Sequence, residues 1–132
     1  MSTITKLEEL EIWQMARRYA KEINRMVTAR SFDPEPGLKQ QMKNASGSIM
    51  DNIAEGFGRG SKNEFVNFLT IAKGSAEESR SQLSRCIDCG LIDQHQHTDL
   101  SGCVDMLVRK IGALIHYLNQ VPIKGQKYKG RL

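Results

Sequence analysis

The sequence predicts an all-α protein, an antiparallel up-down-up-down four-helix bundle that covers residues 1–122. Four long stretches carry apolar residues at the 3.6-residue period of an α-helix, and no stretch shows the sustained two-residue alternation of a half-buried strand. The connections between these stretches are only a few residues long, which makes consecutive helices antiparallel neighbours. A length of 132 residues with 39% hydrophobic content is sufficient for one domain with one core.

The first predicted helix covers residues 7–30. Met15, Tyr19 and Met26 lie roughly 90° from the centre of its main apolar stripe, so this helix has more apolar surface than one seam of a bundle needs. Such surface commonly marks an interface, and we expect these three residues to contact another copy of the chain. The main stripe consists of Ile12, Trp13, Ala16, Ala20, Ile23 and Val27.

The second predicted helix begins at Pro34, with Asp33 as its N-cap, and ends near Gly56. Its apolar stripe includes Ile49 and Ile53, and Asn52 projects between them. A polar side chain there must be hydrogen-bonded, and its expected role is to fix helix register or association state. Candidate partners on the flanks of the second and third helices are Ser48, Glu55, Ser75, Glu78 and Ser79.

The third and fourth helices have clear boundaries. Ser61 followed by Glu64 has the spacing of a capping box, so the third helix begins there and continues to about Cys89, with Gly90 as its stop. The fourth helix covers residues 97–120 and is ended by Pro122. Both helices carry an apolar face that spans about 100°.

The net charge of +4 comes from one end of the chain. Removing the four basic residues after Pro122 from the 19 in the chain leaves 15, which equals the number of acidic residues. We expect residues 123–132 to form a flexible basic tail. Its only aromatic residue is Tyr128, so base stacking there should contribute little. The basic residues of the tail are Lys124, Lys127, Lys129 and Arg131.

A second group of basic residues lies on the first helix. Arg17, Arg18, Lys21 and Arg25 fall within about 100° of one another and away from the apolar stripe. Such a group is either a solvated helix face or a phosphate-binding surface, and repetition of the patch around a ring of protomers favours the second interpretation. Arg59 and Lys62 complete the candidate nucleic-acid surface, because the free N–H groups at the start of the third helix attract anions.

The remaining motifs predict no catalysis and no cofactor. Residues 56–62 are rich in glycine, but they follow a helix and match neither the P-loop nor the dinucleotide fingerprint. The carboxylates of Glu55, Glu64 and Glu78 lack the Glu-x-x-His motif of metal-binding bundles. We therefore expect these carboxylates to be structural or interface residues of a protein that is not an enzyme.

The cysteine and histidine residues predict no metal site. Cys86 and Cys89 form a C-x-x-C pair followed by His95 and His97, but the gap is too short and the histidine pair too narrow for a zinc finger. Cys86 also lies on the apolar face of its helix, which favours a role in core packing.

Localisation follows from what the chain lacks. The three cysteines are typical of reduced thiols, no secretory signal precedes residue 12, and no apolar run approaches the roughly 20 residues of a membrane span. We therefore expect a cytoplasmic protein without a membrane association.

The chain also resembles a known family over roughly residues 7–92. This family consists of four-helix-bundle proteins encoded by intervening sequences in bacterial large-subunit ribosomal RNA genes. The segment Lys43-Asn44 departs from it, because relatives tend to carry paired arginines there. The matching features are the segment Ser-Ile-Met-Asp-Asn-Ile-Ala-Glu-Gly at residues 48–56, Arg59, Glu64-Phe65, Phe68-Leu69, Ala72, Gly74-Ser75, Glu78, Leu10, Trp13, Ala16 and Gln41.

The resemblance implies an antiparallel four-helix bundle that assembles into a cyclic homopentamer without established enzymatic activity. Accessory proteins of diversity-generating retroelements are similar in fold and bind nucleic acid as pentamers. Two functions therefore stay open. The first is a homo-oligomer that binds RNA or a ribonucleoprotein through basic surface, and the second is a protein-interaction scaffold with no nucleic-acid role.

Overall fold

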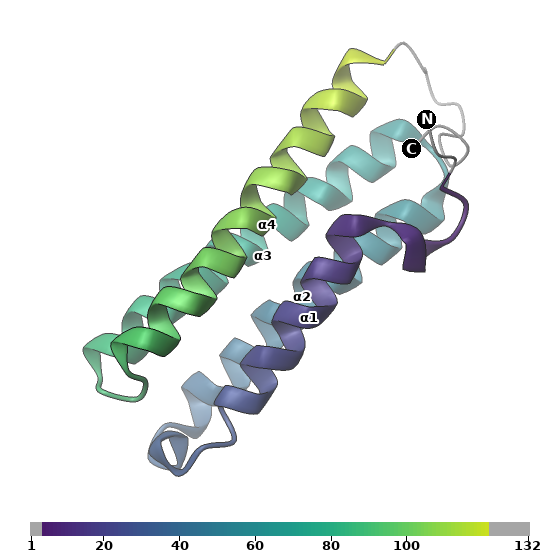
Figure 1. Cartoon of the computed structure of the whole chain (residues 1–132). Coiled ribbons are helices and arrows are strands. Elements are labelled where there is room, and N and C mark those ends of the chain that lie inside the picture. The colour runs from purple at the N-terminus through teal and green to yellow at the C-terminus, as the bar shows by residue number, and fades with distance from the viewer. Residues whose placement is uncertain (1–3, 122–132) are drawn as a thin grey trace.

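The computed structural model describes residues 4–121, and this part of the chain contains four long helices and no strand. Consecutive long helices run antiparallel (Figure 1), which confirms the predicted all-α, up-down-up-down bundle. The predicted tail at residues 123–132 lies outside the described residues. The elements are η1 (Leu7–Glu9), α1 (Glu11–Met26), η2 (Arg30–Phe32), α2 (Pro36–Arg59), α3 (Lys62–Asp88) and α4 (Gln94–Gln120).

The first helix is shorter than the predicted range of residues 7–30. Leu10 is extended (φ −79°, ψ 117°) and separates η1 from α1. At the other end, the Thr28 hydroxyl donates a hydrogen bond to the Arg25 carbonyl at 2.7 Å, and Ala29 is already extended. A threonine side chain that bonds the backbone in this way competes with helix continuation.

The second helix begins at Pro36 and not at Pro34. A proline disfavours helical geometry in the residue before it, and Glu35 is accordingly non-helical (φ −127°, ψ 59°). Asp33 follows η2 and donates its backbone N–H to the Arg30 carbonyl at 3.0 Å, so it is not the N-cap that the sequence predicted. The helix also continues past Gly56 to Arg59, where Gly60 takes the left-handed conformation (φ 85°) and stops it.

The other two helices agree closely with the prediction. The Ser61 hydroxyl accepts a hydrogen bond from the Glu64 backbone N–H at 3.2 Å, which confirms the predicted cap of α3. α4 begins three residues before the predicted boundary, because Asp93 and Gln96 form a capping box that the sequence analysis did not identify. The Gln96 N–H donates to the Asp93 side chain at 2.8 Å, and the Asp93 N–H donates to the Gln96 side chain at 3.0 Å.

α2 and α3 approach each other closely at Gly56. A Cβ atom at this position would lie 2.7 Å from Phe68 Cβ and 3.0 Å from Phe65 Cδ1, closer than packed carbon atoms come. Beside this contact, the rings of Phe57 and Phe65 meet edge to face with their centroids 6.0 Å apart. The α2–α3 and α3–α4 pairs pack most extensively, whereas α1 and α4 touch along a much smaller surface.

Polar side chains also join the helices. The Asn52 amide donates to the Ser48 carbonyl at 2.8 Å and to the Ser48 hydroxyl at 2.9 Å. That hydroxyl lies 2.9 Å from the Ser75 hydroxyl of α3. Asn52 therefore acts through Ser48 on the α2–α3 contact, while Glu55 and Glu78 are exposed and take no part in this network.

The three apolar residues predicted to form an interface on the first helix are largely buried within one protomer. Tyr19 is only 2% exposed and Met26 only 8% exposed, so both belong to the core of one protomer, and Met15 is partly buried against it. The reason is that α1 packs between α2 and α4, and a helix with two neighbours buries a wide apolar arc. Contact of these residues with another copy of the chain stays a prediction. The Tyr19 and Ser79 hydroxyls lie 2.6 Å apart and connect α1 with α3 inside the core, where burial raises the pKa of Tyr19.

We expect Gly56→Ala to lower the free energy of unfolding by about 1–3 kcal/mol, because the added methyl group forces α2 away from Phe68. Gly47→Ala is the matched control in the same helix, since a Cβ atom at that position would have nothing within 4 Å. This control should be neutral or stabilise by up to about 1 kcal/mol. Urea unfolding followed by circular dichroism at one protein concentration measures both, and equal effects would contradict the close contact.

We expect Tyr19→Phe to destabilise the protein by about 1–3 kcal/mol, because it leaves the buried Ser79 hydroxyl without its partner. The double variant Tyr19→Phe/Ser79→Ala should recover most of this loss, since both polar groups are then removed. Thermal or urea unfolding of the two single variants and the double variant gives the coupling energy. Simple additivity of the two single effects would show that the hydroxyl pair is not coupled.

Candidate nucleic-acid interface

Three basic side chains gather on the exposed face of α1. Arg17, Arg18 and Lys21 are all exposed and line one hollow of about 340 Å³. Among residues 4–121, no carboxylate lies within ion-pair distance of any of the three. The other residues that line the hollow are Glu8, Trp13 and Gln14. The arrangement is a concave surface with three cations against the single carboxylate of Glu8, and its net positive charge suits an anionic ligand.

Arg25 differs from the other three predicted residues of this face. Its Nη1 atom lies 3.2 Å from Glu22 Oε1, one turn earlier on the same helix. Both side chains are exposed, so the pair contributes little to stability, but an anionic ligand would meet the Glu22 carboxylate beside the Arg25 guanidinium. The free basic group of α1 is therefore centred on Arg17, Arg18 and Lys21.

Trp13 positions one of these cations. The guanidinium carbon of Arg17 lies 5.7 Å from the centroid of the Trp13 ring, within the range of a cation–π interaction. Trp13 is partly buried against the core, so its ring has a fixed support. The sequence analysis assigned Trp13 to the apolar stripe alone. The spacing of four residues between Trp13 and Arg17 was the signal that it also meets the basic face.

Arg59 and Lys62 already have partners within the described chain. Arg59 Nε lies 3.3 Å from Glu55 Oε2, and its guanidinium also packs over the Phe68 ring. Lys62 Nζ donates to the Val121 carbonyl at 3.2 Å. Arg59 Nη1 is also 3.8 Å from a carboxylate oxygen of Glu64. The start of α3 is therefore a compensated region, unlike the face of α1. The predicted basic residues of the tail, Lys124, Lys127, Lys129 and Arg131, lie outside the described residues.

A groove follows the seam between α1 and α4. Its floor includes Met15, Tyr19 and Leu100, and Met106 lies at its edge with 45% of its surface exposed. A second hollow of about 370 Å³ continues along the same two helices past Met26. Arg18 and Lys21 line the groove from α1, so the basic face and this apolar groove share an edge. Sequence reasoning missed Met106 because it lies outside the main apolar stripe of the fourth helix.

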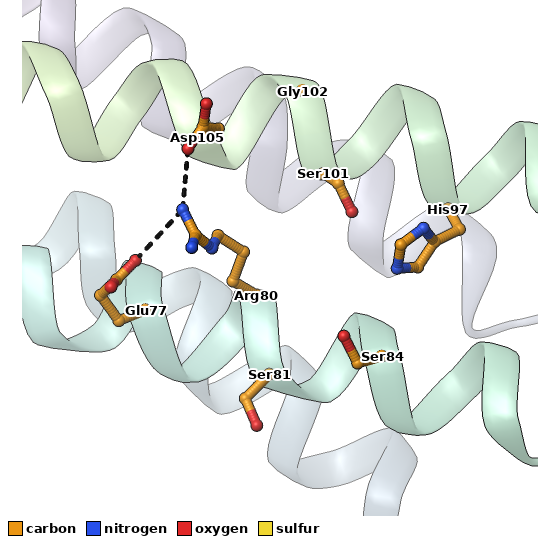
Figure 2. A pocket seen from close by; sticks show the side chains of 8 residues that line it. All are labelled: Glu77, Arg80, Ser81, Ser84, His97, Ser101, Gly102 and Asp105. Atoms are coloured by element: carbon orange, nitrogen blue, oxygen red, sulfur yellow. Dashed lines mark hydrogen bonds and ion pairs between the residues drawn. The ribbon is translucent and has the colours of Figure 1, made fainter.

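Another hollow, of about 610 Å³, lies between α3 and α4 (Figure 2). Arg80, the arginine of this hollow, is paired with two carboxylates: its Nη1 atom lies 2.7 Å from Asp105 Oδ1 and 3.6 Å from Glu77 Oε1. His97 also lines the hollow, and within the described residues no hydrogen bond joins it to a serine hydroxyl. Among the described residues, the side chains of this hollow can hydrogen-bond a ligand, but no serine hydroxyl is paired with His97 as a nucleophile with its base would be. Its small residues are Ser81, Ser84, Ser101 and Gly102.

The three cysteines differ in burial. Cys86 is fully buried with its sulfur 3.3 Å from the Met42 sulfur, as predicted for a core residue, and burial raises its pKa to about 11. Cys89 and Cys103 are exposed. No three metal-ligating side chains gather anywhere in residues 4–121. The helices in this range also include none with the length and apolar character needed to cross a membrane.

Comparison with known proteins identifies relatives of this chain. A solved structure from Bacteroides thetaiotaomicron VPI-5482, described as a protein of unknown function from the S23 ribosomal protein family, aligns with a TM-score of 0.73. The alignment has 20% sequence identity and covers 79% of this chain and 97% of that one, which supports the fold. No curated protein matches the chain. The family model of the 23S rRNA-intervening sequence proteins matches residues 8–113, and the chain therefore belongs to this family.

Proposed function

We propose that this protein is a non-enzymatic homo-oligomer that binds RNA, alone or in a ribonucleoprotein, through the basic face of α1. The observation that carries the proposal is the hollow lined by Arg17, Arg18 and Lys21, three exposed cations without a carboxylate partner among the described residues. A cation that is not already paired on the protein can exchange its solvent ions for a phosphate.

The charge distribution supports phosphate contacts and not sequence-specific reading. Arginine and lysine contacts to phosphates position a nucleic acid without discriminating among bases. Each such contact lowers log K by roughly 0.7–0.9 per tenfold increase in salt. Together with the basic tail from Lys124 to Arg131, the face of α1 would give sequence-tolerant binding that weakens steeply with ionic strength.

The proposed assembly is a ring of identical subunits, and the family resemblance implies five of them. The α1–α4 groove is the surface that favours it, because Met15 and Met106 add partly exposed apolar area to a seam where the two helices of one protomer pack least. A second copy of the chain seated there would cover this area. Repeating the basic face around a ring converts weak single contacts into multivalent binding.

The same groove also favours the alternative function, a protein-interaction scaffold. A methionine-lined groove adapts to the apolar face of a partner helix. In that case the groove would bind another protein, and the basic face would be a solvated helix surface. The two functions differ in whether nucleic acid binds at all.

We expect the triple variant Arg17→Glu/Arg18→Glu/Lys21→Glu to lose most of its RNA binding at low salt, because three phosphate contacts become repulsive. The salt dependence of any residual binding should be shallower by roughly 0.7–0.9 per lost contact. A gel-shift titration with a structured RNA at two salt concentrations measures both effects. A truncation after Pro122 tests the tail separately.

The control for this experiment is the triple variant Arg30→Glu/Lys39→Glu/Lys73→Glu, which has the same net charge but changes other surfaces. It should retain most of the binding, since only the position of the charge differs. If the two triple variants and the truncation bind like the wild type, or if the wild type does not bind at low salt, the scaffold function replaces the proposed one.

We expect the protein to have the mass of an oligomer at micromolar concentration and Met106→Glu to reduce that mass, because a carboxylate in the groove opposes burial by a second copy. Ile71→Glu is the matched control, since Ile71 is 51% exposed on α3 and is not part of the groove. Light scattering after size exclusion measures the mass, and circular dichroism verifies the helical content. A monomeric wild type would refute the assembly.

A further inference from the structure

We propose that the hollow on α1 binds one nucleotide of a single-stranded RNA segment, with its base stacked on the Arg17–Trp13 pair and its phosphate held by Arg18 and Lys21. This inference rests on the proposed RNA-binding function and deepens it. The proposed function requires only phosphate contacts, whereas the hollow adds a site for an unpaired base. Its ligand is thus a nucleotide in single-stranded RNA and not a polyanion in general.

The proposed stacking surface consists of Trp13, which packs on the core, and Arg17, which lies over its ring. Trp13 packs against the core with part of its ring exposed, and Arg17 lies over that ring at 5.7 Å, one helical turn later. A guanidinium that rests on an aromatic ring keeps its plane available on the outer side, and bases stack on arginine planes as well as on aromatic rings. The pair therefore forms a platform that an exposed arginine alone would not hold in place.

The two other cations lie beside this platform. Arg18 and Lys21 line the same hollow as Trp13 and Arg17, and neither has a carboxylate partner in the described part of the chain. A nucleotide carries its charge on the phosphate and its flat apolar surface on the base. The hollow offers cations for the phosphate and a flat platform for the base at one place. Such a combination of basic groove and aromatic surface is typical of proteins that bind single strands.

The other two residues that line the hollow are Glu8 and Gln14. The Gln14 side-chain amide donates to the backbone carbonyl of Glu8, which joins the chain before α1 to the first turns of the helix. Glu8 supplies the only carboxylate side chain among the described residues of this hollow. The fourth cation of the face, Arg25, belongs to the neighbouring hollow and is paired with Glu22, so the site comprises Trp13, Arg17, Arg18 and Lys21.

The experiment uses Trp13 as its own reporter, since it is the single tryptophan of the chain. The full-length protein is titrated with an oligouridylate of about eight nucleotides, within the site sizes of single-strand binders, and with an abasic ribose-phosphate oligomer of equal length. We expect the oligouridylate to bind about tenfold more tightly than the abasic oligomer and to quench Trp13 emission in a saturable way. The abasic oligomer should bind without comparable quenching.

The decisive variant is Arg17→Lys, which keeps the charge and removes the planar group. It should weaken oligouridylate binding about tenfold and change abasic binding less than about twofold. Arg30→Lys, an exposed arginine outside the hollow, is the control and should change neither. Circular dichroism verifies that both variants fold.

The outcomes separate this inference from the function on which it rests. Equal affinity for the two oligomers, unchanged Trp13 emission or an Arg17→Lys variant that behaves like the wild type would overturn the nucleotide site and leave phosphate binding intact. Failure of both oligomers and of structured RNA to bind at low salt would overturn the proposed function as well.

Discussion

The close contact between α2 and α3 at Gly56 is the constraint on which the rest of the bundle depends. Because no side chain separates the two helices there, Phe65 and Phe68 pack directly against the α2 backbone. The same contact brings Ser48 to Ser75 two turns away, where Asn52 supports the pair. α3 also packs extensively against α4, so these three helices form the most closely packed part of the fold.

α1 joins this three-helix frame through apolar packing that is more extensive against α2 than against α4, and through two specific polar contacts. The Tyr19–Ser79 hydrogen bond reaches α3 through the core, and Lys110 of α4 lies 2.9 Å from a carboxylate oxygen of Glu11. Beyond the Glu11–Lys110 pair, the α1–α4 seam stays open as a largely apolar groove that includes Tyr19 in its lining. The α1–α4 groove thus lies next to the basic hollow of α1, and Arg18 and Lys21 line both.

Ion pairing, and not the number of basic residues, distinguishes the surfaces of this protein. Arg59 and Arg80 each form ion pairs with two carboxylates, so these two guanidinium groups are paired within the protein. Arg17 instead rests on an aromatic ring, which holds the guanidinium without neutralising it. A body with equal numbers of basic and acidic residues can therefore still present one positive hollow.

The sequence by itself determined the fold class, the number and order of the helices and the cap of α3, because helical periodicity and capping depend on residues within a few positions of one another. The three-residue spacing of Glu22 and Arg25, which allows their ion pair on one helix, is likewise visible in the sequence. The tertiary structure alone decided that Tyr19 and Met26 are core residues and that Arg80 meets Asp105, since these outcomes depend on which helices become neighbours. It likewise decided that Trp13, Arg17, Arg18 and Lys21 line one hollow, because a concave surface forms only when the side chains and the preceding segment are placed together.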